Sequence, residues 1–269
     1  MRKEEVATRV ITPEQVIVSN TSITANRTFA LGANRLVHWL SRHWLFVFTL
    51  FIGAFAGLPW LAPVFMKLGW TDAANAVYLF YATQCHQLPQ RSFFLFGEQA
   101  MYALGDIQTV WKNSNDPLVL RQFIGNSEMG WKVAWSDRMV FMYTSLLLFG
   151  LAFWPWRRRL KPLPWWALVL LLLPMFLDGF THMLGDFSGG IGGGFRDSNA
   201  WLVALTNGAF AASFYAGDAL GSFNSWMRLI TGVLFGLAVV WFCYPRLHSA
   251  FVDTAHQLDA KFQAAGLKV

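Results

Sequence analysis

The segment from Cys85 to Ser92 reads Cys-His-Gln-Leu-Pro-Gln-Arg-Ser and gathers reactive side chains between apolar flanks at 77–81 and 93–96. It holds a thiol, an imidazole, two amides and a guanidinium. Polar groups placed against hydrocarbon or a protein interior are costly unless they find partners. The segment therefore predicts one of three things: a metal site, a site for a substrate head group, or an internal polar network.

A second group of reactive side chains lies near residue 180. Asp178 and His182 are four residues apart, so on a helix they occupy one face, one turn from each other. Ionisable side chains within a membrane-spanning helix indicate a functional site by default. The pair could be a general base oriented by its carboxylate. It could equally be a buried ion pair of Asp178 with Arg138 or Arg228, beside a structural histidine. A role in conduction or transport is a third interpretation.

A divalent metal ion is the cofactor that these side chains suggest. Zinc accepts cysteine, histidine and aspartate ligands, and Cys85, Asp178 and His182 are the candidates. His86 directly follows Cys85, and neighbouring side chains diverge, so we expect a single ligand from that pair. The sequence has no paired Cys-x-x-Cys spacing, so it does not require a metal.

Arginines near these groups suggest recognition of an anion. The guanidinium fork matches phosphate or carboxylate, so Arg91 and Arg228 could hold an anionic head group. Alternatively, each could extend along an apolar surface to the membrane interface. The candidate catalytic residues are Cys85, His86, Asp178 and His182, and the candidate substrate-binding residues are Arg91, Ser92, Asp137, Arg138, Asn224, Arg228 and Thr231.

The composition predicts which elements position these residues. The 269 residues are 55% hydrophobic and 17% aromatic but only 13% charged, whereas a soluble domain carries about 25% charge. Apolar stretches at 44–66, 139–156, 163–184 and 226–244 are long enough to cross a bilayer, and aromatic residues lie at their ends. The fold class predicted is an all-α, polytopic membrane bundle of four helices. Polar tails at 1–43 and 245–269 flank a membrane domain at 44–244.

Two weaker segments predict helices that lie at, or dip into, the outer membrane surface. One runs from Asp72 to Gln84, with Thr71 as its N-cap. The other, 199–215, is interrupted by Asn207 and Gly208. The stretch 106–131 is expected to be a polar loop. The glycine run at 189–194 is expected to be a flexible linker, because it lacks the Lys-Ser/Thr ending of a phosphate loop.

The distribution of basic residues predicts the orientation. Cytoplasmic loops of membrane proteins are enriched in lysine and arginine, and the short loop 157–161 carries four of them. We therefore expect a multi-pass protein of the cell membrane with both termini in the cytoplasm, and with the candidate residues on the extracytoplasmic side. If 199–215 crosses fully, the last span reverses and the C-terminus lies outside.

Three motifs resemble a known family. They are Cys85-His86-Gln87-x-Pro89-x-Arg91-Ser92, the segment Asp178-Gly179-Phe180-Thr181-His182, and Asn224-x-x-x-Arg228-x-x-Thr231-Gly232. Together they resemble the prokaryotic membrane proteins grouped as domain of unknown function 2085, over roughly residues 75–240. Many members carry a Cys-Ala-Arg-Cys-like motif where this chain has Trp135-Ser136-Asp137-Arg138. The departure argues against a cysteine-rich metal site here, and the resemblance implies no established activity.

Three functions remain open from the sequence. The first is an enzyme that acts on a lipid or another amphiphile at the extracytoplasmic interface. The second is an accessory or structural subunit of a larger membrane complex, in which the polar motifs fix helix register. The third is a small transporter or channel, which the absence of an internal repeat disfavours. The expected partners are the lipid bilayer and, in the second case, other membrane subunits; no nucleic-acid footprint is present.

Overall fold

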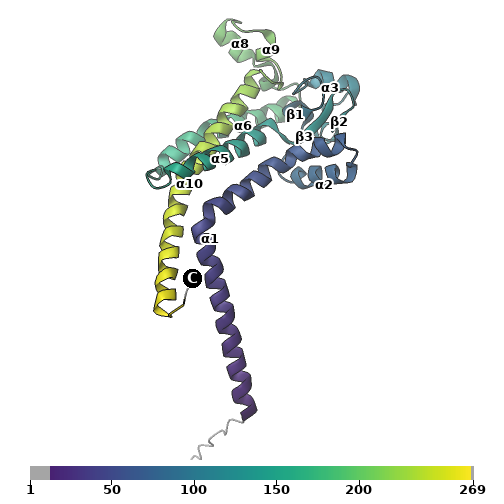
Figure 1. Cartoon of the computed structure of the whole chain (residues 1–269). Helices are drawn as coiled ribbons and strands as arrows, with labels where there is room; N and C mark the ends of the chain where they lie inside the picture. Colours follow the sequence, from purple (N-terminus) through teal and green to yellow (C-terminus); the bar gives the residue numbers. More distant parts are fainter. Residues whose placement is uncertain (1–12, 268–269) are drawn as a thin grey trace, which may run out of the picture. The chain divides into compact units, whose positions relative to one another are not determined.

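The computed structural model describes residues 13–267, with side chains from residue 27 (Figure 1). The helices are α1 (Pro13–Lys67), α2 (Thr71–Ala82), the short 3₁₀ helix η1 (Pro89–Arg91), α3 (Leu104–Val110), α4 (Pro117–Leu120), α5 (Asp137–Trp156), α6 (Trp165–Gly189), α7 (Phe195–Ser198), α8 (Ala200–Thr206), α9 (Ala212–Tyr215) and α10 (Phe223–Ala264). The strands are β1 (Ser92–Leu95), β2 (Gly125–Asn126) and β3 (Gly130–Ser136).

Four helices in the described part of the chain are long and apolar enough to cross a membrane. They comprise Arg27–Lys67 of α1, all of α5 and α6, and α10. The predicted all-α bundle with four spans is thereby confirmed. With 55 and 42 residues, α1 and α10 are far longer than the roughly 20 residues that one bilayer crossing requires. The helix of α1 thus extends into the segment that was expected to be a polar tail, whereas residues 1–12 lie outside the described residues.

The chain divides into two compact units, one formed by residues 45–248 and the other by the residues on either side. In the flanking unit, an ion-pair cluster joins the α1 segment to the end of α10. Nε2 of His38 lies 2.8 Å from Oδ1 of Asp259, while Nη2 of Arg42 donates to Oδ2 at 2.9 Å. Trp44 stacks on Phe251 nearby, with ring centroids 5.4 Å apart. These contacts hold the two helix extensions together.

Within the unit 45–248, α5 and α10 approach closely at two glycines of α10. A Cβ on Gly232 would lie 2.8 Å from Cβ of Phe141, and one on Gly236 would lie 2.6 Å from the backbone nitrogen of Leu146. The hydroxyl of Ser145 donates to the carbonyl of Gly232 at 2.9 Å. Small residues four apart are the usual means of close helix packing in membranes.

A three-stranded antiparallel sheet, with the order β1-β3-β2, lies between α2 and α5 in the sequence. Ser92 pairs with Ser136, and Leu95 pairs with Trp131. The expectation of a polar loop over 106–131 missed β2 and the start of β3. These strands are short, and β3 passes directly into α5, so its residues resemble the apolar start of a span. The sheet fixes the octapeptide next to the first turn of α5.

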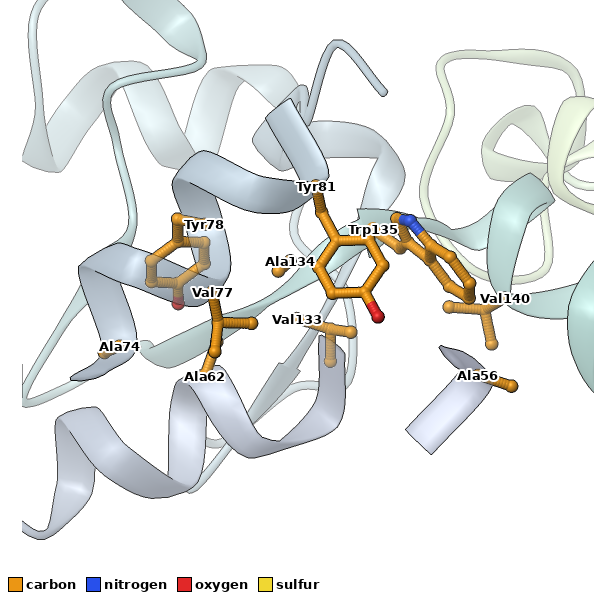
Figure 2. Close-up of a cluster of buried hydrophobic side chains, with 10 residues drawn as sticks. All are labelled: Ala56, Ala62, Ala74, Val77, Tyr78, Tyr81, Val133, Ala134, Trp135 and Val140. Atoms are coloured by element: carbon orange, nitrogen blue, oxygen red, sulfur yellow. The ribbon is translucent and has the colours of Figure 1, made fainter. Parts of the chain in front are cut away.

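The core of this unit packs α1 and α2 against β3 and α5 (Figure 2). Trp135 of β3 is fully buried and stacks on Tyr143, with ring centroids 4.8 Å apart. Tyr81 meets Trp135 edge-on and donates its hydroxyl to the carbonyl of Phe55 at 2.8 Å. Aromatic pairs of this kind add packing energy beyond the area they bury. The core therefore holds β3, and with it the first turn of α5, in a single position.

Three local predictions need correction. Helix α2 forms as expected, but Trp70 occupies its N-cap and no side chain caps it, so Thr71 is the first helical residue. The glycine run is a packed turn and not a loose linker, since a Cβ on Gly193 or Gly194 would lie within 2.5 Å of a backbone carbonyl oxygen. Segment 199–215 forms α8 and α9 with a break after Thr206. Its placement at the membrane surface stays a prediction.

We expect Gly236→Ala to destabilise the protein, because its methyl group would collide with the α5 backbone. Overpacking of this kind costs about 1–3 kcal/mol. Gly57→Ala is the matched control, since Gly57 also lies within a helix but has open space where the methyl would be. Thermal unfolding in detergent should show a lower midpoint for Gly236→Ala alone. Equal midpoints for both variants would contradict the close α5–α10 contact.

Candidate functional site

The largest ion-pair chain in the unit 45–248 is built on two buried arginines. Arg91 of η1 makes a bidentate pair with Asp186 of α6 at 2.9 and 3.0 Å, and its Nε donates to Asp218 at 2.7 Å. Arg228 of α10 donates to the other oxygen of Asp218 at 2.7 Å and to Asp137, the first residue of α5, at 2.7 Å. Side chains from η1, α5, α6, α10 and the loop before α10 are therefore joined by charge-assisted hydrogen bonds.

A second ion-pair chain is centred on Asp178 of α6. One carboxylate oxygen accepts from Arg138 of α5 at 2.7 Å, and the other accepts from Arg196 of α7 at 2.7 Å. Arg196 also donates to Nε2 of His182 at 3.3 Å and to the hydroxyl of Thr181 at 3.2 Å. Asp178 is 4.0 Å from His182, too far for a hydrogen bond. Asp178 therefore binds two guanidinium groups and does not orient the histidine.

The glycine turn explains how Arg196 reaches Asp178. It lets α7 fold back onto α6, where the backbone of Gly194 packs against the carbonyl of Gly185. The carboxylate of Asp197 accepts the amide N–H of Gly194 at 2.9 Å and closes the turn. A side chain at Gly194 would push α7, and Arg196 with it, away from α6. The turn therefore positions one of the two guanidinium groups that pair with Asp178.

Gln87 organises the octapeptide. It adopts a left-handed backbone conformation with a φ of 54°, which is uncommon for a residue other than glycine. Its amide nitrogen bridges the carbonyls of Tyr78 and Ala134 at 2.8 and 3.0 Å. Its backbone N–H donates to the sulfur of Cys85 at 3.4 Å, and the N–H of Ser136 donates to the same sulfur at 3.4 Å. Sγ of Cys85 therefore accepts two backbone N–H groups.

A cavity of about 590 Å³ lies between these elements. Its charged wall is formed by Arg91, Asp137, Arg138, Asp186 and Arg228, together with His182. Cys85, His86 and Ser136 lie on the octapeptide side, and Leu88, Pro117, Met139, Met183, Phe187 and Ile191 supply apolar surface. Ligand sites are usually concave and mainly apolar, with a few convergent polar groups, and this cavity has that character.

Most of the residues singled out in the sequence come together here, but four of them do not line the cavity. Asp178 lies behind Arg138 and Arg196. The Ser92 hydroxyl donates to the carbonyl of Leu88, and that of Thr231 to the carbonyl of Met227. Asn224 donates to the carbonyls of Arg196 and Gly217, so it fastens the loop after α7 to α10. These groups support the site from outside it.

Comparison with known proteins agrees with the sequence motifs. Residues 127–242 match the model of a family described as "Predicted membrane protein (DUF2085)". Over this region the chain is similar to the DUF2085 family. An uncharacterized protein of Methanocaldococcus jannaschii is 27% identical over 154 residues, which cover 54% of this chain and 76% of that protein. No solved structure gives a significant match.

The matched region contains Asp137, Arg138, both α6 motif residues and Arg228, whereas the octapeptide precedes it. It also contains functional side chains that sequence reasoning missed. Asp186 could have been found, because it continues the face of Asp178 and His182 by one more turn. Arg196 lies in the one-turn helix α7 and Asp218 in the loop before α10, neither of which shows periodicity, so only the fold shows that they face the other charges.

The metal site predicted at Cys85, Asp178 and His182 is not supported. Within the described residues, no group of three or more His, Cys, Asp or Glu side chains lies close enough to hold an ion. The physical reason is that both oxygens of Asp178 already accept from arginines, while the sulfur of Cys85 is hydrogen-bonded to Ser136 and Gln87. The positive charge that balances the Asp178 carboxylate comes from the guanidinium groups of Arg138 and Arg196.

The charges of the first ion-pair chain sustain one another. Burial alone would raise the pKa of Asp218, but Arg91 and Arg228 outweigh it and hold this pKa well below its usual range. Burial would likewise lower the pKa of Arg91, but Asp218 and Asp186 raise it further above its ordinary value. Both groups therefore stay charged at any pH at which the protein is folded.

We expect Asp218→Asn to be strongly destabilising, because it leaves two buried arginines without their shared carboxylate. Removing one partner of a buried ion pair costs about 3–5 kcal/mol. Glu98→Gln, a charge-neutralising change at an exposed loop residue, is the control. Thermal unfolding in detergent should separate the two variants by many degrees. A midpoint for Asp218→Asn close to that of the control would contradict the role of this carboxylate.

Lys132 of β3 lies beneath the octapeptide and is completely buried. Its ammonium donates to the carbonyl of Gln87 at 2.8 Å and to that of Arg121 at 2.7 Å. Burial lowers the pKa of Lys132 to about 7; the nearby Cys85 acts in the opposite direction, and Arg121 adds to the lowering. This lysine therefore ties the octapeptide to the end of α4.

The pH dependence of stability should reveal this lysine. Above pH 7 the folded protein releases the Lys132 proton while the unfolded chain keeps it up to its ordinary pKa near 10.5. The free energy of unfolding should therefore rise with pH in that window, by up to about 1.4 kcal/mol per pH unit. Unfolding between pH 7 and 9 should show this slope in the parent and in Lys112→Met, but not in Lys132→Met or Lys132→Gln. A slope that persists in both Lys132 variants would refute the assignment.

Proposed function

We propose that this membrane protein binds a lipid or another amphiphile in the cavity, with the polar head at the charged wall. The observation that carries the proposal is the division of the cavity lining. One side consists of Arg91, Asp137, Arg138, Asp186 and Arg228, whereas Leu88, Met183, Phe187 and Ile191 provide an apolar side. A molecule that is itself polar at one end and apolar at the other matches both sides.

The surroundings of α6 support access from the bilayer. The helix exposes large apolar side chains along its length, and Phe176, Leu177, Phe180, Met183, Leu184 and Phe187 are each at least 43% exposed. Met183 and Phe187 belong to this surface and also line the cavity. A candidate membrane span therefore presents lipid-facing residues at the cavity itself. This arrangement favours a ligand that enters from the membrane.

The enzymatic form of this proposal assigns the chemistry to Cys85. Its thiol is partly exposed and lines the cavity, and two backbone N–H groups would stabilise charge that develops on its sulfur. His86 and His182 line the same cavity and are the candidate groups for proton transfer. Asp178, which binds two arginines, holds Arg138 at the cavity wall and takes no part in proton transfer.

We further propose that the cavity opens on the extracytoplasmic side of the cell membrane, with both termini in the cytoplasm. The turn between α5 and α6 carries Arg157, Arg158, Arg159 and Lys161. The opposite ends of these two helices carry Asp137, Arg138 and Asp186. Because basic loops stay in the cytoplasm, the positive-inside rule places the cavity on the other side.

The alternative function is that of a structural subunit in a larger membrane assembly. It is favoured by how completely Arg91 and Arg228 are paired. All three nitrogens of each guanidinium group donate to aspartate oxygens. A network closed in this way fixes the register of α5, α6 and α10, whether or not a ligand binds.

A substitution that fills the cavity should separate the two functions. Met183→Trp adds bulk at the lining, while Leu184→Trp adds the same bulk at a neighbouring position with similar exposure, 44% against 46%, away from the cavity. Native mass spectrometry of the detergent-purified protein should show bound lipid on the parent and on Leu184→Trp. We expect at least a fivefold loss for Met183→Trp. Absence of bound lipid on all three proteins, with fixed copurifying subunits, would favour the structural role.

A further inference from the structure

We infer that the cavity selects a zwitterionic head group, which places an oxyanion such as phosphate against Arg138 and His182 and an ammonium group against Asp186. The inference rests on the proposed binding of an amphiphile and names the class of its head group. It follows from how charge is divided between the two ion-pair chains, from which members of each chain are accessible, and from the protonation of His182.

The two ion-pair chains carry opposite net charge when their members are ionised. Around Asp178, two arginines, Arg138 and Arg196, share a single carboxylate, which leaves one positive charge in excess. In the other chain, Arg91 and Arg228 face three carboxylates, those of Asp137, Asp186 and Asp218, which leaves one negative charge in excess. Both chains contribute to the cavity wall. The two excess charges are equal and opposite, so the two chains together are balanced.

The most accessible cation and the most accessible anion belong to different ion-pair chains. The side chain of Arg138 is 20% exposed, more than that of any other arginine in the two chains. The side chain of Asp186 is 26% exposed, whereas the other three carboxylates are nearly inaccessible. Both Arg138 and Asp186 line the cavity. Among the charged groups that line the cavity, Arg138 and Asp186 are therefore the cation and the anion most accessible to a ligand.

Arg138 keeps donors for a ligand. Within the described residues its side chain has one hydrogen bond, from Nη2 to Asp178. Nη1 lies beside Gly179, where an added Cβ would come within 2.8 Å of it. In contrast, Arg91 and Arg228 direct every guanidinium nitrogen at an aspartate. We therefore assign the oxyanion contact to Arg138, and not to Arg91 or Arg228.

His182 supplies a second donor. A guanidinium group can only donate, so the contact from Arg196 makes Nε2 of His182 an acceptor. In the neutral imidazole the proton then resides on Nδ1. The side chain is 8% exposed and lines the cavity, and no described residue accepts from Nδ1. This N–H has no acceptor among the described residues, so it can donate to a ligand oxygen.

The spacing along α6 suits one small head group. His182 and Asp186 are four residues apart on a helix, which separates their backbones by about 6 Å and places them on one face. An oxyanion at His182 and an ammonium at Asp186 would thus be one helical turn apart. A short linker such as that of phosphoethanolamine joins its two charges over a comparable span.

The test compares head groups on the unaltered protein, so it does not depend on whether a variant folds. Short-chain phosphatidylethanolamine, phosphatidylglycerol and phosphatidic acid would be titrated into the detergent-purified protein, with binding followed by tryptophan fluorescence. We expect phosphatidylethanolamine to bind about tenfold more tightly than the two lipids that lack an ammonium group, the effect of one charge-assisted hydrogen bond. Competition by free O-phosphoethanolamine would assign the ligand to a soluble source, and failure to compete would assign it to a lipid.

Variants then locate the two ends of the ligand. Asp186→Asn should abolish the preference among the three lipids, while Asp186→Glu should retain it. Arg138→Gln and His182→Phe should weaken all three lipids by a similar factor, and Glu98→Gln should change nothing. Equal affinity of the parent for all three lipids, with binding still lost in Met183→Trp, would overturn this inference but leave the proposed function intact. Absence of binding by any lipid would remove both.

Discussion

Four arginines placed inside an apolar bundle must each find a carboxylate, and this constraint governs the arrangement of the helices. An uncompensated buried charge costs several kcal/mol, more than any single apolar contact returns. Arg228 on α10 forms ion pairs with Asp137 on α5 and with Asp218. Asp218 in turn pairs with Arg91, which lies beside β1. No helix in this chain of contacts can slide along its neighbour without breaking an ion pair. The close α5–α10 packing at Gly232 and Gly236 depends on the same register.

The octapeptide is held by a different principle. Its backbone leaves regular structure at Gln87, where the left-handed conformation reverses the chain between α2 and η1. Such a conformation persists only where the surroundings enforce it. Here the side-chain amide of Gln87 donates to the carbonyls of Tyr78 and Ala134. Its backbone carbonyl accepts from Lys132, and its backbone N–H donates to Cys85. The position of Cys85 at the cavity therefore depends on residues of β3.

The sequence predicts the membrane class, the four spans and most of the polar residues that meet, since apolar length and charge depletion are local properties. It does not predict the sheet, because the sheet depends on the pairing of residues far apart in the chain, such as Ser92 with Ser136. The partner of Asp178 was predicted in part, because Arg138 was one of the two arginines considered, but Arg196 was missed. Arg196 lies in the one-turn helix α7 and reaches Asp178 because the glycine turn folds α7 back onto α6, which no periodicity in the sequence indicates.

The same pairing decides which arginines can serve a ligand. Residue type alone makes Arg91 and Arg228 the natural anion binders, yet carboxylates pair with both. Each of their guanidinium nitrogens already donates to an aspartate oxygen, which for Nη2 of Arg228 is the backbone carbonyl of Asp218. Arg138 differs because it shares Asp178 with Arg196, so one carboxylate serves two cations. The unequal sharing leaves one positive charge in excess around Asp178, whereas the chain of Arg91 and Arg228 has one negative charge in excess. Under the proposed function, structural ion pairs and ligand recognition would be two aspects of one network, in which the accessible members are incompletely compensated.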